Sequence, residues 1–375
     1  MRFSMPMLGK NEAREELCRL ALQEGANRRE LCRRFGVQPR ILYKWLERYR
    51  VEGVAGLADH SRRPGRSPGR TGPELEAAVL AVRRENPVWG GRKIAATLAR
   101  RGVVPPSPST ITEILRRNAV ALVAPGQKGW KRFEHAEPNV LWQMDFKGEV
   151  AMARGELHPL TIIDDHSRFS VGLQAADNER HGTVQDGLQA AFERYGLPLL
   201  MLSDNGSPWG DTGEGSLTRL GVWLIEHGVA PLHSAPYHPQ SHGKNERFNR
   251  TLEAELLAGR TFADLASAQR AFDAWRHHYN HHRPHDALAL AVPADRYRPS
   301  PRPFSTTVEP FEYGPDDILR RVDGAAWFSF GGRRMKASKA LIGKQIAIRP
   351  TERDGTFDLV FRHVTVKTID FHKLA

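Results

Sequence analysis

Residues 140–147, VLWQMDFK, alternate between apolar and polar side chains. Alternation with a period of two is the pattern of a β-strand that buries one face. The apolar face carries Val140, Trp142, Met144 and Phe146, and the other face carries Leu141, Gln143, Asp145 and Lys147. Aspartate is disfavoured in strands and costly to bury without a partner. The sequence therefore predicts a sheet here, with a carboxylate on Asp145 that needs a compensating group.

The residues that follow alternate between strand-like and helix-like segments. HPLTIIDDHSRFSVGLQ predicts two strands around a turn at 164–167, and a helix is predicted from Asn178 to Tyr195. LPLLMLSDNG predicts a buried strand that ends at Asp204, before the Asn-Gly break. A helix near 216–227, a strand in VAPLHSA and a further helix complete the order. This order predicts a mixed α/β domain, in which ligands gather at strand ends.

A third acid, Glu246, opens the last of these helices, after the loop SAPYHPQSHGKN. Phe248, Leu252 and Leu256 recur every four residues and form the buried stripe of the helix, nearly opposite Glu246. An acid in a first turn also stabilises the helix dipole by about 0.3–1 kcal/mol, so capping is the simpler alternative. Capping leaves the two strand acids unexplained.

Asp145, Asp204 and Glu246 together fit a site for divalent cations. Mg²⁺ prefers oxygen ligands and keeps open positions for water and phosphate oxygens. Two such ions about 3.5–4 Å apart can hold both the attacking and the leaving oxygen of a phosphoryl transfer. The three acids therefore predict metal-dependent chemistry on a phosphodiester.

Basic residues are concentrated on both sides of this acidic middle. The net charge is +12, with 27 Lys and Arg against 14 Asp and Glu in residues 1–138, 15 against 20 in 139–300, and 13 against 9 in 301–375. Clustered cations favour a polyanion partner because phosphate contacts release counterions. A basic surface also keeps a protein in solution, so charge alone leaves that alternative open.

Apolar residues between 12 and 50 fall at helical spacing in three groups, with a Gly-containing turn at 35–37 before the third. We therefore predict a helix-turn-helix domain over 1–58, whose final helix enters the major groove of double-stranded DNA. The side chains expected to contact DNA are Gln38, Arg40, Lys44 and Arg48. A helical bundle with a solvated basic face is the alternative.

A second helix-turn-helix-like domain is predicted over 73–125, after a basic linker at 59–72 that contains no apolar side chain. Ser109 is expected to cap its third helix, and Arg116 and Arg117 are predicted DNA contacts. The linker either follows a narrow minor groove, where arginine is attracted, or serves as a plain tether. Its candidate contacts are Arg62, Arg63, Arg66 and Arg70.

A Pro-rich segment at 300–310 precedes short β-type runs, AWFSF, QIAIRP, FDLVF and HVTVKTIDF. They predict a small β-barrel over 311–375 that binds DNA or another subunit, or else serves as a cap without such contacts. Its basic side chains expected at the surface are Arg333, Arg334, Lys336, Lys339 and Lys344.

The two cysteines, Cys18 and Cys32, are too few for a disulfide scaffold, and a reducing cytoplasm is the simplest expectation. No apolar run approaches the roughly 20 residues that span a bilayer, and the first residues lack the apolar segment of a signal peptide. A soluble protein without a membrane partner is expected.

Three motifs taken together, W-x-M-D-F-K-G, S-D-N-G-S and P-Y-H-P-Q-S-x-G-K-x-E-R-x-N-x-T-L, resemble the catalytic core of DDE transposases of bacterial insertion sequences over residues 138–300. These enzymes are relatives of retroviral integrases with a ribonuclease-H-like fold. The resemblance implies that Asp145, Asp204 and Glu246 are the catalytic, metal-binding triad for Mg²⁺ or Mn²⁺. It also implies a dimer or larger oligomer on DNA, and contacts to DNA ends from His238, Gln240 and Lys244.

The resemblance implies a transposase that binds terminal inverted repeats, cleaves 3′ ends and transfers them to target DNA. Asp204 and Glu246 are separated by 41 residues, more than the usual spacing in the family, and a Gly-rich insertion at 209–216 accounts for the excess. Glu253 is the rival on the same helix face, but lies about 10 Å further along the helix. A non-catalytic DNA-binding regulator and a ribonuclease for RNA–DNA hybrids are the alternative functions.

Overall fold

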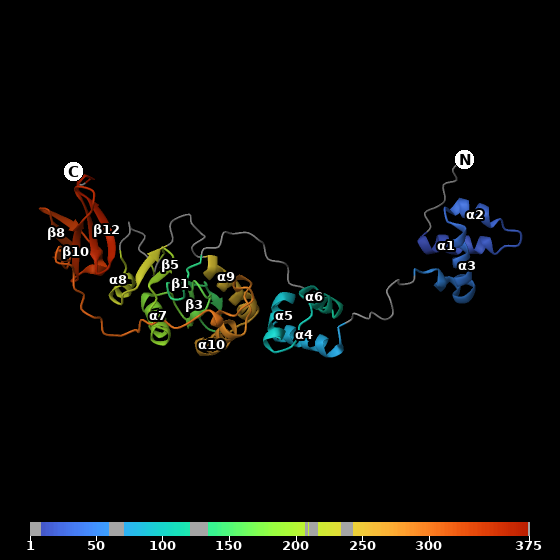
Figure 1. Cartoon of the computed structure of the whole chain (residues 1–375), viewed down its shortest axis with the longest axis horizontal. Helices are drawn as coiled ribbons and strands as arrows, with labels where there is room; N and C mark the ends of the chain where they lie inside the picture. Colours follow the sequence, from blue (N-terminus) through green and yellow to red (C-terminus); the bar gives the residue numbers. More distant parts are fainter. Residues whose placement is uncertain are drawn as a thin grey trace. The chain divides into compact units, whose positions relative to one another are not determined.

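The computed structural model describes residues 9–59, 71–120, 134–206, 209, 217–233 and 243–373. These residues form two compact units, Met1–Arg70 and Thr71–Ala375. Figure 1 labels the helices and strands of each unit in chain order. No helix in the described ranges is both long and apolar enough to cross a membrane.

The first unit contains three helices and a short 3₁₀ turn. They are α1 (Lys10–Ala21), α2 (Arg28–Phe35), α3 (Pro39–Glu52) and the 3₁₀ turn Gly53–Leu57. Gly36 ends α2 with φ of 66°, a left-handed conformation that glycine adopts without strain. Leu17, Leu42 and Leu46 are buried between the helices. The predicted helix-turn-helix arrangement is confirmed, and Cys18 and Cys32 are both free and buried in its core.

The second unit begins with three more helices, α4 (Pro73–Glu85), α5 (Gly91–Arg100) and α6 (Pro108–Arg117). Val79, Ile94 and Ile111 are fully buried where the three helices meet. The expected cap at Ser109 is wrong, because Ser107 precedes α6 and its hydroxyl accepts a hydrogen bond from the Thr110 amide at 3.2 Å. Pro108 fits the first helical position, where no amide donor is needed, and so sets the start of the helix.

A mixed sheet follows, and it confirms the predicted α/β order. Its strands are β1 (Leu141–Phe146), β2 (Val150–Ala151), β3 (Glu156–Asp164), β4 (Ser170–Ala176), β5 (Leu200–Ser203) and β6 (Ala230–His233). β1 pairs antiparallel with β3 and parallel with β5, β5 pairs parallel with β6, and β4 lies against β3. The turn expected at 164–167 connects β3 to β4. β2, which pairs with the start of β3, had no counterpart in the expectation.

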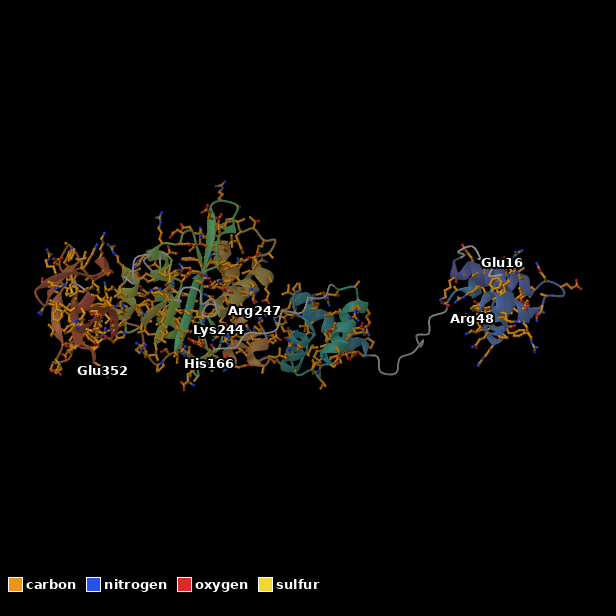
Figure 2. The ribbon with its side chains drawn as sticks, turned by 90° about the horizontal axis from the view of Figure 1, so that it is seen from above. Glu16, Arg48, His166, Lys244, Arg247 and Glu352 are labelled. Carbon is orange, nitrogen blue, oxygen red and sulfur yellow. The ribbon has the colours of Figure 1, made fainter. Side chains whose placement is uncertain are left out.

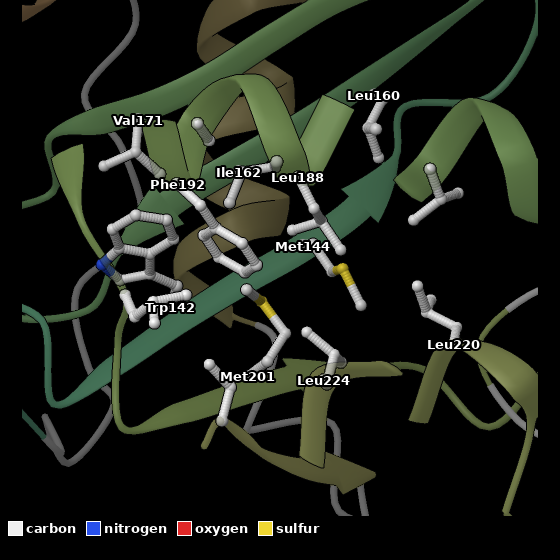
Figure 3. Close-up of a cluster of buried hydrophobic side chains, with 14 of the residues drawn as sticks. Trp142, Met144, Leu160, Ile162, Val171, Leu188, Phe192, Met201, Leu220 and Leu224 are labelled. Atoms are coloured by element: carbon white, nitrogen blue, oxygen red, sulfur yellow. The ribbon is translucent and has the colours of Figure 1, made fainter. Parts of the chain in front are cut away.

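Two layers of helices cover the two faces of this sheet. α7 (His181–Tyr195) and α8 (Arg219–Glu226) pack on one face, where Trp142, Met144 and Phe192 form a buried apolar cluster (Figure 3). α9 (Gly243–Leu252), the π-helical turn Glu253–Leu257 and α10 (Leu265–His281) cover the other face around Phe248 and Phe272. Because Trp142 and Met144 face α7 and α8, the alternation along β1 turns Asp145 toward α9.

The C-terminal residues form two small antiparallel sheets and not the closed barrel that was expected. Four strands pair in the order β12-β11-β10-β7, and β8 pairs only with β9 in a hairpin. Their bounds are β7 (Ile318–Arg321), β8 (Trp327–Phe330), β9 (Arg333–Lys336), β10 (Gln345–Pro350), β11 (Thr356–Phe361) and β12 (Val364–Asp370). The hairpin contacts the larger sheet through ring packing of Phe330 on Phe357, with centroids 4.9 Å apart. Side-chain packing thus replaces the strand pairing that would close a barrel.

Two predicted surface cations of this region, Arg334 and Lys344, form ion pairs within the protein, and Arg334 lies 2.7 Å from Asp323. The Lys344 ammonium lies 2.5 Å from a carboxylate oxygen of Glu226 on α8. Arg333, Arg334, Lys336 and Lys339 are exposed, as expected.

Candidate active site

Asp145 and Asp204 lie at the same level of two neighbouring parallel strands. The register pairs Trp142 with Met201 and Gln143 with Leu202. Counting two residues further along each strand places Asp204, the residue after β5, opposite Asp145. Neighbouring strands lie about 4.8 Å apart, and residues at equivalent positions point to the same face. The structure therefore brings two of the three predicted acids together at the carboxyl end of β5.

The electrostatics of Asp145 reflect this proximity. Burial and the negative charge of Asp204 raise the pKa of Asp145 to about 6, and the charge of Glu179 acts in the same direction. A hydrogen bond from the Asn249 side chain, at 3.1 Å, favours the ionised form and opposes the rise. Among the described residues, Asp145 has no ion pair with a lysine or arginine. The site holds more negative charge than its protein neighbours neutralise, which is the condition a cation relieves.

Three side chains spaced four residues apart, two on α9 and one on the π-helical turn after it, contact β3, β1 and the residue after β1. Asn245 Oδ1 is 3.1 Å from the Thr161 hydroxyl, which is also 3.0 Å from the Asp145 carbonyl oxygen. Asn249 donates to the Asp145 carboxylate, and Glu253 lies 3.1 Å from the Lys147 ammonium. A spacing of four keeps these side chains on one stripe of the helix. The stripe fixes the position of α9 relative to Asp145.

Glu246 lies in the first turn of α9 and is exposed. It precedes Asn249 by three residues, so the two side chains are neighbours on the helix surface. No group of three His, Cys, Asp or Glu side chains in the described ranges is arranged to hold a metal ion. The structure thus brings Asp145 and Asp204 together. Glu246 lies on α9 about one helical turn before Asn249, the residue that contacts Asp145.

The rival acid, Glu253, is already paired with Lys147. That ion pair neutralises its charge, whereas Glu246 makes no ion pair among the described residues. The pairing favours Glu246 over Glu253 as a ligand for an added cation.

Asp165 is a buried acid whose partner was missed from the sequence. Its side chain is 1% exposed and accepts from Gln143 Nε2 at 2.8 Å and from the Lys244 ammonium at 2.5 Å. Burial lowers the pKa of Lys244. Lys244, predicted to contact DNA, therefore attaches the start of α9 to the turn after β3. The polar Gln143 on a buried strand was the one sequence signal for this network.

Asp164, by contrast, stabilises the turn itself. Its carboxylate accepts hydrogen bonds from the Ser167 amide and the Asn139 amide, both at 2.7 Å. These bonds account for the turn that the sequence predicts at 164–167.

The other predicted DNA contacts fall into three groups. Gln38, Arg40 and Lys44 are exposed on or just before α3, and Arg48 is half-buried on the same helix (Figure 2). Arg116 pairs with Glu113 at 2.5 Å, and Arg117 joins α6 to α4 by an ion pair with Glu76. The positions outside the described residues are Arg62, Arg63, Arg66, Arg70, His238 and Gln240.

Models of known protein families match most of the chain, each over a different region. A helix-turn-helix domain model matches residues 14–65, and a homeodomain-like domain model matches 41–115. Two integrase core domain models match 135–239 and 227–293. The C-terminal domain of IS481 family transposases matches 317–374. The chain therefore combines helix-turn-helix, integrase core and IS481 transposase C-terminal sequences, and it is similar to insertion-sequence transposases of that family.

Proteins similar to this chain come from bacterial insertion elements and retroviruses. An uncharacterized 39.2 kDa protein of insertion element IS476 from Xanthomonas euvesicatoria is 32% identical over 159 residues, 42% of this chain and 44% of that protein. An uncharacterized 31.7 kDa protein of IS407 from Burkholderia multivorans is 25% identical over 60% of this chain and 82% of that protein. The Gag-Pol polyprotein of baboon endogenous virus is 29% identical over 49% of this chain and 11% of its own length. The match thus spans less than half of the IS476 protein.

Solved structures similar to this chain include retroviral integrases. A simian T-cell lymphotropic virus intasome, solved with a PP2A regulatory subunit, has a chain with a TM-score of 0.40 and 13% identity, covering 79% of this chain and 96% of that one. An HTLV-2 integrase catalytic core in complex with magnesium has a TM-score of 0.33 and 16% identity, covering 43% of this chain and 97% of that one.

Proposed function

We propose that this protein binds the terminal inverted repeats of an insertion sequence, cleaves the DNA at the 3′ ends of the element and joins those ends to target DNA. The observation that carries the proposal is the pair of carboxylates, Asp145 and Asp204, at equivalent positions of two parallel strands. Helix α9 brings Glu246 to the adjoining face. The matches to the integrase core and to the C-terminal domain of IS481 family transposases support the same reaction class.

The acids fit a divalent cation, Mg²⁺ or Mn²⁺. Asp145 and Asp204 are oxygen donors, and burial together with the negative charge of Asp204 raises the pKa of Asp145. A cation bound between them would be attracted by both carboxylates. We assign Asp145, Asp204 and Glu246 as the metal-holding residues. When bound, the metal supplies the Lewis acid and a lowered pKa for an attacking water.

The side chains around the triad have separate tasks in this proposal. The hydrogen bond from Asn249 fixes the orientation of the Asp145 carboxylate. The ion pair between Lys244 and Asp165 holds the first turn of α9 in place. In cleavage, a water oxygen bonds to phosphorus, the bond to the 3′ oxygen breaks, and that oxygen takes up a proton. In strand transfer, the freed 3′ hydroxyl attacks a target phosphodiester in the same way. No covalent protein–DNA intermediate is required.

The flanking regions supply recognition of DNA in this proposal. The exposed cations of α3 suit the major groove, and residues 1–58 and 73–125 are assigned as the reading domains, joined by the linker at 59–72. Residues 138–300 hold the chemistry, and 311–375 bind DNA or another subunit. Two ends must be brought together for transfer, so the working form is a dimer or larger oligomer, in the bacterial cytoplasm.

The test uses a labelled duplex made from the inverted repeats that flank the gene, incubated with the full chain and Mg²⁺ or Mn²⁺. Nicking that frees a 3′ hydroxyl at the repeat end, absent from the Asp145→Asn variant, is expected. Binding without nicking would favour the alternative, a DNA-binding regulator. Faster cleavage of an RNA–DNA hybrid than of the repeat would favour a ribonuclease.

A further inference from the structure

The helices α4, α5 and α6 contact the catalytic core at the segment between α4 and α5. Trp89 lies in that segment, and its indole Nε1 donates a hydrogen bond to Glu255 at 3.2 Å. The ring of Trp89 also stacks on His278 of α10, with the ring centroids 5.5 Å apart. The Nε2 atom of His278 lies within hydrogen-bonding distance of Asn86 Oδ1, at 2.9 Å. Two hydrogen bonds and a ring stack therefore join the helices to the core before the start of α5.

Helix α5 adds two ion pairs with the core. Arg92, near its start, lies 2.7 Å from Asp286, and Arg100, its last residue, lies 2.8 Å from Asp295. The two arginines are separated by roughly 12 Å along the helix axis. Because α5 is held near both of its ends, a rotation about either contact alone is opposed by the other.

Two of the acids that receive these contacts are held in place by the core itself. The Glu255 carboxylate pairs with Arg283 at 2.8 Å, and both side chains are 9% exposed. The Asp295 carboxylate accepts a hydrogen bond from the Val292 amide at 3.1 Å. Each acid thus has a defined position in the core against which Trp89 or Arg100 is placed.

Glu255 also connects this junction to the candidate active site. It lies in the π-helical turn Glu253–Leu257, which continues α9. Earlier in the same continuous stretch, Asn249 donates to the Asp145 carboxylate at 3.1 Å. At 1.5 Å per residue, Asn249 and Glu255 are about 9 Å apart along the axis. The helices α4–α6 are therefore attached to the stretch of helix that contacts Asp145.

We propose that α4–α6 form a fixed arm of the catalytic core, and that this arm sets the number of base pairs between the sequence it reads and the phosphodiester that is cleaved. The inference rests on the proposed function, in which residues 73–125 read the repeat. The arm belongs to the same compact unit as the core, Thr71–Ala375. Ser109 and Arg116 of α6 are exposed, so α6 can enter a major groove while α5 stays attached to the core. Because base pairs are about 3.4 Å apart, a fixed arm selects one phosphodiester.

The first measurement maps the nick on the labelled repeat duplex after base pairs are inserted between the cut and the sequence required for binding. With a fixed arm, the nick keeps its distance from that sequence, so it moves relative to the end of the element by the number of base pairs inserted. A nick that stays at the end of the element would overturn the inference.

A junction variant tests whether the arm sets this spacing. It removes the ring stack, the contact with Asn86 and both ion pairs of α5 through the changes His278→Ala, Arg92→Met and Arg100→Met. Nicks are expected to spread to neighbouring phosphodiesters, and a single unchanged position would overturn the inference. A control variant carries the same types of change away from the junction and should keep the single position: His277→Ala, Arg84→Met and Arg101→Met.

The second measurement is independent of cleavage. Spin labels at two exposed positions, Ala77→Cys on α4 and Ala274→Cys on α10, report the distance between the arm and the core in the full chain. The native Cys18 and Cys32 are buried. We expect a narrow distance distribution in the parent protein and a broad one in the junction variant. A broad distribution in the parent, or an unchanged narrow one in the variant, would overturn the inference.

The two measurements separate the arm from the chemistry. A parent protein that gives a narrow distribution but no nick shows a failure of the proposed function and leaves the fixed arm supported. If the junction variant does not fold, the parent protein still decides, through its distance distribution and its nick positions on the duplexes with inserted base pairs.

Discussion

Asn249 on α9 donates a hydrogen bond to the Asp145 carboxylate on β1, with 3.1 Å between Nδ2 and Oδ2. This contact joins the helix that carries Glu246 to the strand that carries the central acid. The Oδ1 atom of Asn249 is buried without a hydrogen-bond partner among the described residues. The side-chain nitrogen of Asn249 therefore makes the contact that matters here, the hydrogen bond to Asp145.

Replacing Asn249 by alanine should slow DNA cleavage without weakening DNA binding. A hydrogen bond to a charged group is worth about 1.5–3 kcal/mol, which corresponds to a rate loss of roughly ten- to hundredfold if the contact serves the reacting state. Cleavage of the repeat duplex and its binding are measured on the same protein. A cleavage rate equal to that of the parent would show that Asn249 has no part in positioning Asp145.

Asp145→Asn should stabilise the metal-free protein at neutral pH. The pKa of Asp145 is raised from 3.8 to about 6, so the folded state binds its proton more tightly than the unfolded state does. Above about pH 6 the ionised form opposes folding, by at most about 3 kcal/mol, and access to solvent reduces this. Protonation of the folded state removes that penalty as the pH falls from about 6 to 3.8.

The gain in melting temperature from Asp145→Asn should therefore be largest near neutral pH and shrink on acidification. Asp186→Asn, at an exposed position of α7, is the control for loss of one negative charge. A gain that is constant across the pH range would contradict the raised pKa of Asp145.

Arg283→Met should destabilise the protein strongly, because it leaves the carboxylate of Glu255 buried without its cation. Breaking one partner of a buried pair costs about 3–5 kcal/mol, whereas the double change Arg283→Met with Glu255→Met should cost less than the single one. Arg298→Met serves as the comparison, since Arg298 and Glu137 are 69% and 66% exposed. Chemical unfolding gives all three values, and a double change that costs as much as Arg283→Met alone or more would contradict the coupling.

Lys244→Met should lower thermal stability, because the 1% exposed Asp165 carboxylate loses its cation. A loss of roughly 1–3 kcal/mol is expected for a buried acceptor that keeps its other donors. If the melting temperature instead stays constant while the salt dependence of DNA binding weakens, Lys244 acts as the DNA contact that its motif implies.

The sequence predicted the parts of the site that depend on local pattern. Alternation around Asp145 gave its strand and its face correctly, and the Asn-Gly break after Asp204 gave the end of β5. The partners of Lys244 and Arg117 depend on elements brought together by folding, and no local pattern records which acid a cation will meet. The prediction of a closed barrel was wrong for a similar reason. The sequences of β8 and β9 are consistent either with strands that close a barrel or with a separate hairpin.

The convergence of the three acids is the central claim. The structure brings Asp145 and Asp204 together and places Glu246 about one helical turn before Asn249, which contacts Asp145. A crystal structure of the protein grown with Mn²⁺ and end DNA, with the metal located by its anomalous scattering, tests this claim most directly. We predict two manganese peaks about 3.5–4 Å apart, coordinated by Asp145, Asp204 and Glu246. Manganese coordinated elsewhere, with Glu246 still pointing away from Asp145 and Asp204, would contradict it.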